Sequence, residues 1–175
     1  MEQSKKILFL GFSQSGKTKI LFRLVLHDDV VTIPTIGFNN EKIEISNQDI
    51  VIWDLGGRKE LISYWIHYYT GVSGIVFVID RNNDSDIKNV IEAISNMLDN
   101  EDLIDVPIAF FMNKGDLEEK VTFDTIISKV GEDKIFKHPY NVFQTTSSDE
   151  DSILEGMNWL ISQFNSLDAG QTNED

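Results

Sequence analysis

The residues most able to do chemistry stand near the start of the chain, where residues 11–18 read Gly-Phe-Ser-Gln-Ser-Gly-Lys-Thr. This segment fits the pattern of a phosphate-binding loop, G-x-x-x-x-G-K-[ST], whose glycines let successive backbone N–H groups turn inward around a β-phosphate. Lys17 would place its ammonium on the β- and γ-phosphates, and Thr18 would offer its hydroxyl to Mg²⁺. The pattern therefore predicts nucleotide binding. The predicted contacts in this loop are Gly11, Ser13, Gln14, Ser15, Gly16, Lys17 and Thr18.

A second motif, Asn113-Lys114-Gly115-Asp116, indicates which base is bound. Guanine presents a ring N–H and an amino group on one edge, and the Asp116 carboxylate can accept both hydrogen bonds. Adenine lacks this pair of donors, so a buried Asp116 would stay unpaired against it. Asn113 would support the loop and reach the other edge of the purine, while the Lys114 stem would cover the ring face. The motif follows an apolar run, which favours a guanine site over an exposed turn.

Thr146 and Ser147 are candidates for backbone contact to the guanine carbonyl oxygen. They belong to a run of four hydroxyl residues, 145–148, after the last predicted strand. A simple Ser/Thr turn explains this run equally well.

A third group of candidates follows the apolar run of residues 50–53. Asp54 could hold Mg²⁺ opposite Thr18, usually through water. Gly57 could bring its backbone N–H to a γ-phosphate because no side chain intervenes. An Asp-x-Gly-Gly sequence alone is more often a turn, but its distance from the phosphate-binding loop favours the metal-binding interpretation.

These motifs need a scaffold that brings them together, and the hydrophobic pattern predicts one. Apolar runs or alternating segments predict strands at residues 6–10, 38–45, 50–55, 75–80, 106–113 and 141–145, and helical spacing predicts helices at 17–26, 85–98 and 152–164. Such alternation with one hairpin predicts an α/β fold of three layers. Its six-stranded sheet would be mostly parallel, with one antiparallel hairpin strand and helices on both faces. Ligands of such sheets bind at the carboxyl ends of the strands.

Composition limits the classes of function. The 175 residues suit a single domain, which we place at 1–167, followed by an acidic tail at 168–175 that we expect to be disordered. The absence of cysteine excludes disulfides and thiolate metal sites. A net charge of −14 disfavours binding to nucleic acid or to an anionic membrane surface. The three histidines lack the spacing of metal ligands.

Beyond the two nucleotide motifs, four segments resemble the ADP-ribosylation factor (Arf/Arl) family of small GTPases. They are Val31–Asn39, Trp53–Gly57, Trp65–Tyr68 and Glu155–Leu160, and the similarity runs over roughly residues 6–165. The resemblance is to a divergent member of this family. It implies the P-loop GTPase fold (G domain), with GTP or GDP and Mg²⁺ as ligands.

The resemblance also implies roles that residue types alone do not reveal. Thr35 would be the switch I threonine, with its hydroxyl on Mg²⁺ and its backbone N–H at the γ-phosphate. Phe38, Trp53 and Tyr68 would form an exposed aromatic surface for effector proteins, whereas the sequence alone favours core aromatics. The family switches by sliding the predicted hairpin by two residues, which keeps its apolar face unchanged. An exchange factor and a GTPase-activating protein are expected as further partners, and the chain is expected to be a monomer.

Position 58 departs from the family pattern. Arg58 stands where the family has the switch II glutamine that orients the attacking water, and arginine has only donors. We therefore expect slow hydrolysis, with Lys17, Gly57 and Arg58 as the residues nearest the chemistry. Alternatively, Arg58 acts in cis as an arginine finger while Glu60 or a partner residue positions the water, or Arg58 is simply exposed and another group compensates.

The first residues differ from the family as well. Position 2 is not glycine, and only five residues precede the first predicted strand, so we expect no direct lipid anchor. The expected location is the cytoplasm, with peripheral association with endomembranes only through protein partners, in vesicle traffic as the family implies. Ser13 also replaces an acidic residue of the family.

Three functions from different classes fit this pattern. The first is a GTPase switch. The second is a GTP-dependent interaction module that does not hydrolyse its nucleotide. Arg58 is the sequence feature that distinguishes this function from the first. The third, another P-loop enzyme such as a nucleotide kinase or ATPase, is disfavoured by residues 113–116 and by the lack of an arginine-rich lid.

Overall fold

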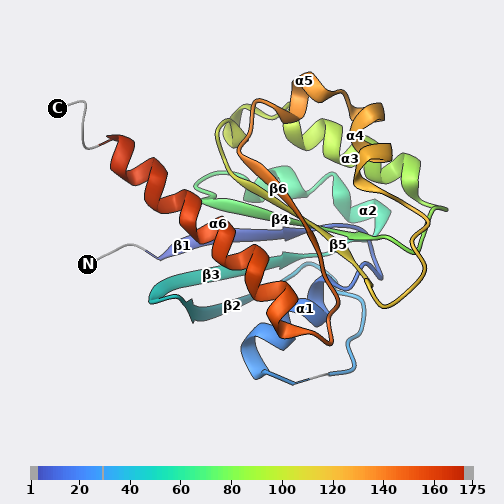
Figure 1. Ribbon diagram of the computed structural model, residues 1–175, viewed down its shortest axis with the longest axis horizontal. Coiled ribbons are helices and arrows are strands. Elements are labelled where there is room, and N and C mark those ends of the chain that lie inside the picture. The colour runs from blue at the N-terminus through green and yellow to red at the C-terminus, as the bar shows by residue number, and fades with distance from the viewer. Residues whose placement is uncertain (1–3, 29, 172–175) are drawn as a thin grey trace.

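Six strands form one sheet in the order β2-β3-β1-β4-β5-β6. The computed structural model describes residues 4–28 and 30–171, the stretch 165–171 by its backbone only (Figure 1). The strands are β1 (Lys5–Leu10), β2 (Phe38–Ile45), β3 (Gln48–Leu55), β4 (Gly74–Asp80), β5 (Ile108–Asn113) and β6 (Tyr140–Gln144). All neighbouring strands are parallel except β2 and β3, which are antiparallel. The predicted fold class, mostly parallel with one antiparallel hairpin strand, is confirmed.

Helices cover both faces of the sheet, as predicted. They are α1 (Lys17–Leu26), α2 (Lys59–Ile62), α3 (Ile87–Leu98), α4 (Phe123–Val130), α5 (Glu132–Ile135) and α6 (Glu150–Gln171), with short 3₁₀ helices η1 (Trp65–Tyr68) and η2 (Glu101–Leu103). In Figure 1, α6 crosses in front of the sheet and α3, α4 and α5 lie beyond its upper edge. The sheet is therefore the middle of three layers.

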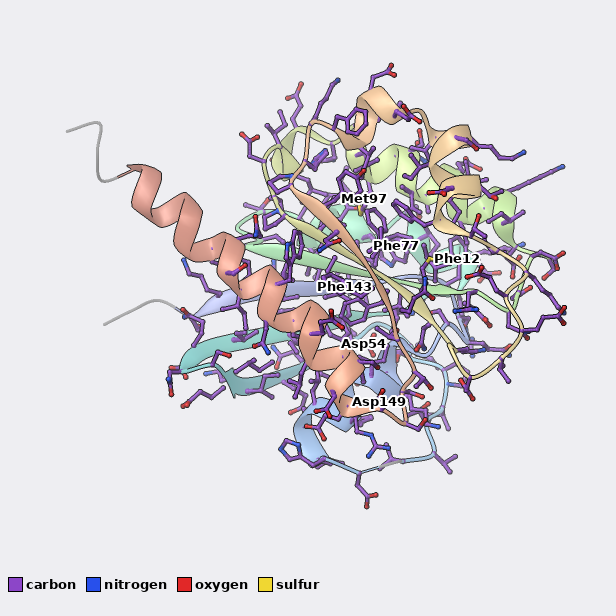
Figure 2. All side chains as sticks on the ribbon, viewed as in Figure 1. Phe12, Asp54, Phe77, Met97, Phe143 and Asp149 are labelled. Atoms are coloured by element: carbon purple, nitrogen blue, oxygen red, sulfur yellow. The ribbon has the colours of Figure 1, made fainter. Side chains whose placement is uncertain are left out.

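Each face of the sheet has its own apolar core. On one face, α1 and α6 pack against alternate residues of the central strands, among them Phe9 and Phe111. On the other face, η1, α3, α4 and α5 pack against the intervening residues, such as Leu8, Phe77 and Phe110. Phe77 and Phe143, labelled in Figure 2, belong to opposite cores. Because β1, β4 and β5 are buried on both faces, they show continuous apolar runs instead of alternation.

The hairpin between β2 and β3 is tighter than predicted. The sequence suggested a loop of four residues, 46–49, but β3 already begins at Gln48. Ser46 and Asn47 both have a left-handed backbone, with φ of 52° and 60°. This is the backbone of a two-residue turn whose twist matches that of the strands. Gln48 therefore pairs directly with Ile45.

Several boundaries differ from the prediction because apolar spacing does not mark where a helix or strand ends. The strand predicted at 106–113 begins at Ile108, since Pro107 has no N–H to donate. The helix predicted at 85–98 begins at Ile87, after a turn in which Asn83 Oδ1 accepts from the backbone N–H of Ser85. The short helices α2, α4 and α5 were not predicted, and neither were η1 and η2.

The last helix is longer than the predicted segment 152–164. It begins at Glu150 and continues to Gln171, so residues 168–171 of the expected tail are helical. Residues 172–175 lie outside the described part of the chain, and the division of the chain at 167 stays a prediction. None of the helices described is both long and apolar enough to span a bilayer.

Candidate functional site

The two predicted nucleotide motifs meet at the carboxyl edge of the sheet, where a cleft of about 510 Å³ opens. Twelve of the fourteen predicted nucleotide-binding residues line it. They are Ser13, Gln14, Gly16, Lys17, Thr18, Thr35, Gly57, Asn113, Lys114, Asp116, Thr146 and Ser147. The other two, Gly11 and Ser15, are buried in the loop and are not among the lining residues. The topology therefore brings together segments about 95 residues apart in the sequence.

Direct contacts join the phosphate-binding loop to the base motif. Asn113 ends β5 and is buried, and its Nδ2 donates to the Ser15 carbonyl oxygen at 2.8 Å. Gly16, with φ of 98°, lies so close that a Cβ there would be 2.3 Å from Asn113 Nδ2. A side chain at position 16 would thus be excluded by both backbone strain and space. Thr145 Oγ1 donates to Asn113 Oδ1 at 3.2 Å, so Asn113 is held from two sides.

Lys17 is the buried cation of the site, only 6% exposed. It begins α1, and its Nζ donates to the Phe12 carbonyl oxygen at 3.3 Å. Burial lowers the pKa of Lys17 to about 8, although the nearby Asp54 carboxylate opposes this shift. A phosphate in the cleft would supply the anionic partner that this ammonium needs.

The predicted metal ligands converge on one corner of the cleft. Thr18 Oγ1 donates to Asp54 Oδ2 at 2.5 Å and lies 2.9 Å from Thr35 Oγ1. Thr35 Oγ1 also lies 3.4 Å from Asp54 Oδ2. The carboxylate is fully buried (labelled in Figure 2), and burial raises its pKa more than Lys17 and the three hydrogen-bonding neighbours lower it. We call Thr18, Thr35 and Asp54 the metal corner.

The donor set of the metal corner suits Mg²⁺. Mg²⁺ prefers oxygen ligands and keeps several waters, and the corner offers two hydroxyls and one carboxylate. Asp54 Oδ1 is buried and has no hydrogen-bond partner among the described residues, which leaves it a free lone pair for a cation or a bound water. Within 4–28 and 30–171, no group of three or more His, Cys, Asp or Glu is arranged so that it could hold a metal ion.

The segment after β3 closes over the phosphate-binding loop. The Ser13 backbone N–H donates to the Gly57 carbonyl oxygen at 2.8 Å. A Cβ on Gly57 would lie 2.4 Å from the Gly11 carbonyl oxygen, so only glycine fits this contact. Gly56 N–H donates to the Gly37 carbonyl at 2.8 Å and joins this segment to the one that carries Thr35. Arg58 follows at the N-terminus of α2 and is exposed.

The base end of the cleft is more open. Asp116 is exposed, and its Oδ1 accepts from Thr146 Oγ1 at 3.1 Å. Lys114 Nζ lies 2.5 Å from Asp80 Oδ2. Asp116 is therefore not buried, contrary to the prediction from the sequence. Asp116 lines the cleft and stays accessible to a base that enters it.

Two residues of this site were missed by the sequence analysis. Asn39 Nδ2 lies 3.4 Å from Asp54 Oδ2, because Asn39 and Asp54 face each other across the hairpin. Asp80 pairs with Lys114 of the base motif. Asp80 was signalled by its type and place, a polar residue at the carboxyl end of a buried strand. The contact of Asn39 with Asp54 could be predicted only from the correct hairpin register. The predicted four-residue loop gave a different register.

The three predicted effector aromatics lie together outside the cleft. The ring centroids of Phe38 and Trp53 are 4.9 Å apart, those of Phe38 and Tyr68 5.7 Å, and those of Trp53 and Tyr68 5.8 Å. Phe38 is 46% exposed, and the other two are partly buried. We call Phe38, Trp53 and Tyr68 the aromatic surface.

Comparison with known proteins agrees with this geometry. The sequence model of the ADP-ribosylation factor family matches residues 1–164. Among solved structures, the chain is similar to the small GTPase Arl6 (BBS3) of Trypanosoma brucei, whose structure contains the nucleotide analogue GppNp. The TM-score is 0.83 and the sequence identity 24%, over 94% of this chain and 99% of the other. At this identity the structural match supports the fold.

Proposed function

The chain belongs to the ADP-ribosylation factor family of small GTPases, and from this premise we propose that it is a Mg²⁺-dependent guanine-nucleotide switch with slow hydrolysis. The observation that carries the proposal is the shared cleft, which is lined both by the buried Lys17 and by the exposed Asp116. Lys17 would bind the β- and γ-phosphates, and Asp116 would accept both donors of guanine.

The metal corner supports the Mg²⁺ part of the proposal. Thr18 and Thr35 would be direct ligands, and Asp54 would hold the ion through a water. When bound, Mg²⁺ would neutralise charge on the β- and γ-phosphate oxygens. Thr35 lies on the segment before β2 and reaches the corner only when this segment is closed, as it is here. A γ-phosphate and Mg²⁺ would therefore stabilise the conformation described, and GDP would stabilise it less.

The slow-hydrolysis part rests on Arg58. Gly57 would bring its N–H to the γ-phosphate, and the next residue is the one that would orient the water in this family. Arg58 has only donors, so it cannot accept a hydrogen bond from that water. It is also exposed and does not line the cleft. Both features favour a long-lived GTP state. In that state the aromatic surface would stay available to effector proteins.

The test has two stages. The purified protein is denatured and the released nucleotide identified; adenine nucleotide would contradict the guanine assignment. Hydrolysis of bound GTP is then followed in a single turnover for the wild type, Arg58→Gln and the neighbouring control Lys59→Gln. We expect Arg58→Gln to cleave GTP at least about tenfold faster, because glutamine can both accept from water and donate to phosphate. The control should match the wild type.

The same experiment decides between the alternatives. If Arg58→Gln cleaves GTP no faster, slow hydrolysis does not come from Arg58. If it cleaves GTP more slowly, Arg58 acts as a finger in cis. No cleavage by either protein would favour the GTP-dependent interaction module.

A further inference from the structure

Lys6 lies in β1, outside the nucleotide cleft, on the face of the sheet that carries the aromatic surface. Its neighbours on this face, Leu8 and Leu10, belong to the core that η1 covers. The Lys6 side chain is only partly exposed, and its burial lowers the pKa of the ammonium. A desolvated ammonium needs hydrogen-bond acceptors, and Lys6 finds them in η1 and the turn after it.

The Lys6 ammonium contacts two different segments of the chain. Its Nζ donates to the Tyr68 carbonyl oxygen at 2.6 Å and to the Thr70 carbonyl oxygen at 3.2 Å. The first carbonyl belongs to the last residue of η1 and the second to the turn after it, where a helix leaves its acceptors unsatisfied. The same Nζ lies 5.5 Å from the centroid of the Trp53 ring, within the range of a cation–π contact. One side chain thus contacts the backbone of η1 and the Trp53 ring of β3.

The main chain makes Lys6 a fixed point. β1 lies in the middle of the sheet between β3 and β4. The Ser73 backbone N–H donates to the Lys6 carbonyl at 2.8 Å, and the Lys6 N–H donates to Ser73 Oγ at 3.3 Å. Trp53 and Tyr68, in contrast, belong to the hairpin and the segment after it, which would move in the proposed switch. Trp53 pairs with Leu8, two residues along β1 from Lys6. A two-residue slide of the hairpin would displace Trp53 by about 7 Å along β1, so the ring and the ammonium would not keep the arrangement described here in the other register.

We propose that Lys6 is a positioning residue of the aromatic surface: it holds the end of η1 beside Trp53 and does so in only one register of the hairpin. The inference rests on the proposed switch function, because it assigns Lys6 to the GTP-bound conformation. An effector would then meet three aromatics whose relative positions are set by a side chain that it does not need to touch.

The test compares Lys6→Met, which keeps the apolar stem but loses the charge, with Lys6→Arg, which keeps a cation able to donate and to stack on a ring. Lys5→Met is the matched control, because Lys5 is the next residue of the same strand and points to the other face. Two quantities are measured in each protein, with GDP and with a non-hydrolysable GTP analogue. They are amide hydrogen exchange in residues 66–72 and oxidation of the Trp53 side chain by hydroxyl radicals.

With the GTP analogue, we expect Lys6→Met to exchange about tenfold faster than the wild type in residues 66–72, through loss of charged hydrogen bonds. Trp53 oxidation should rise as well. Lys6→Arg and Lys5→Met should resemble the wild type, and with GDP all four proteins should agree within about twofold. If Lys6 only stabilised the fold, Lys6→Met would raise amide exchange and Trp53 oxidation equally with GDP and with the GTP analogue, and that result would overturn the proposal. Unchanged exchange in Lys6→Met would overturn it as well. If Lys6→Met does not fold, Lys6→Gln replaces it.

Nucleotide content is measured before exchange. A wild-type protein that retains no guanine nucleotide contradicts the proposed function itself. A protein that retains it normally, but shows no effect of Lys6→Met, contradicts only the role of Lys6.

Discussion

The two ends of the cleft are built in opposite ways. We call residues 11–18 with the metal corner the phosphate end, and residues 113–116 with Thr146 and Ser147 the base end. The polar groups at the centre of the phosphate end, Ser15, Lys17 and Asp54, are buried, and Ser15 Oγ and Asp54 Oδ1 have no hydrogen-bond partner among the described residues. At the base end, Asp116 is exposed and is already paired with Thr146.

This difference separates affinity from selectivity. A desolvated ammonium and unpaired buried polar atoms gain strongly when phosphate and metal arrive, whatever the base. An exposed carboxylate that exchanges one set of hydrogen bonds for another gains little affinity, but it loses much when the wrong base leaves it unpaired. The phosphate end should therefore control how tightly nucleotides bind, and the base end which nucleotide binds.

The largest predicted effect tests the phosphate end. Lys17→Ala should weaken binding of GDP by on the order of 100-fold to 1000-fold, because it removes a buried charge partner of the phosphates. Binding of xanthosine diphosphate should weaken by the same factor, since the base plays no part in this contact. Affinities are measured by displacement of a fluorescent nucleotide, with Lys88→Ala on the exposed face of α3 as control. A loss that differs between the two bases would contradict the division between the two ends.

The next effect tests the base end. Asp116→Asn replaces an acceptor pair with one donor and one acceptor, which matches xanthine and mismatches guanine. Affinity for GDP should fall by roughly 100-fold while affinity for xanthosine diphosphate rises. The same displacement assay measures both, with Asp124→Asn, an exposed residue of α4, as control. If both nucleotides lose affinity equally, Asp116 supports the loop and does not read the base.

The base end also shows how far the sequence can predict a site. The motif at 113–116 and the loop at 11–18 were recognisable because each needs fixed residue types at fixed spacing after a buried strand. The fold class was predictable from the alternation of strand and helix patterns along the chain.

Contacts that depend on the register between distant segments were not predictable. Asn39 reaches Asp54 only because Ser46 and Asn47 form a two-residue turn. Lys6 contacts η1, a 3₁₀ helix that no hydrophobic periodicity predicted. The hydrophobic pattern fixes which face of a strand is buried, but it does not fix which side chains meet across it.

A smaller effect concerns the metal corner. Because it belongs to the phosphate end, only that end should depend on Mg²⁺. Thr35→Ala removes one hydroxyl and should lower affinity for a GTP analogue about tenfold in the presence of Mg²⁺, but change GDP affinity less than about twofold. The physical reason is that Thr35 would reach the ion only in the closed conformation. Thr32→Ala, on the same segment, is the control. An equal loss of affinity for GDP and for the GTP analogue would mean that Thr35 stabilises the fold of the segment and does not respond to the γ-phosphate.

The smallest effect is a pH dependence that belongs to the phosphate end alone. Free protein loses the Lys17 proton as pH rises through a pKa of about 8, whereas the complex keeps it, because phosphates favour the charged form. Binding therefore takes up a proton above that pKa, and affinity falls as pH rises. Between about pH 7 and about pH 8.5, GDP affinity without Mg²⁺ should fall roughly fourfold. Lys17→Arg keeps its proton over this range and should show no such slope, while Asp116→Asn should keep the wild-type slope at lower affinity. A slope that survives in Lys17→Arg would mean that another group takes up the proton.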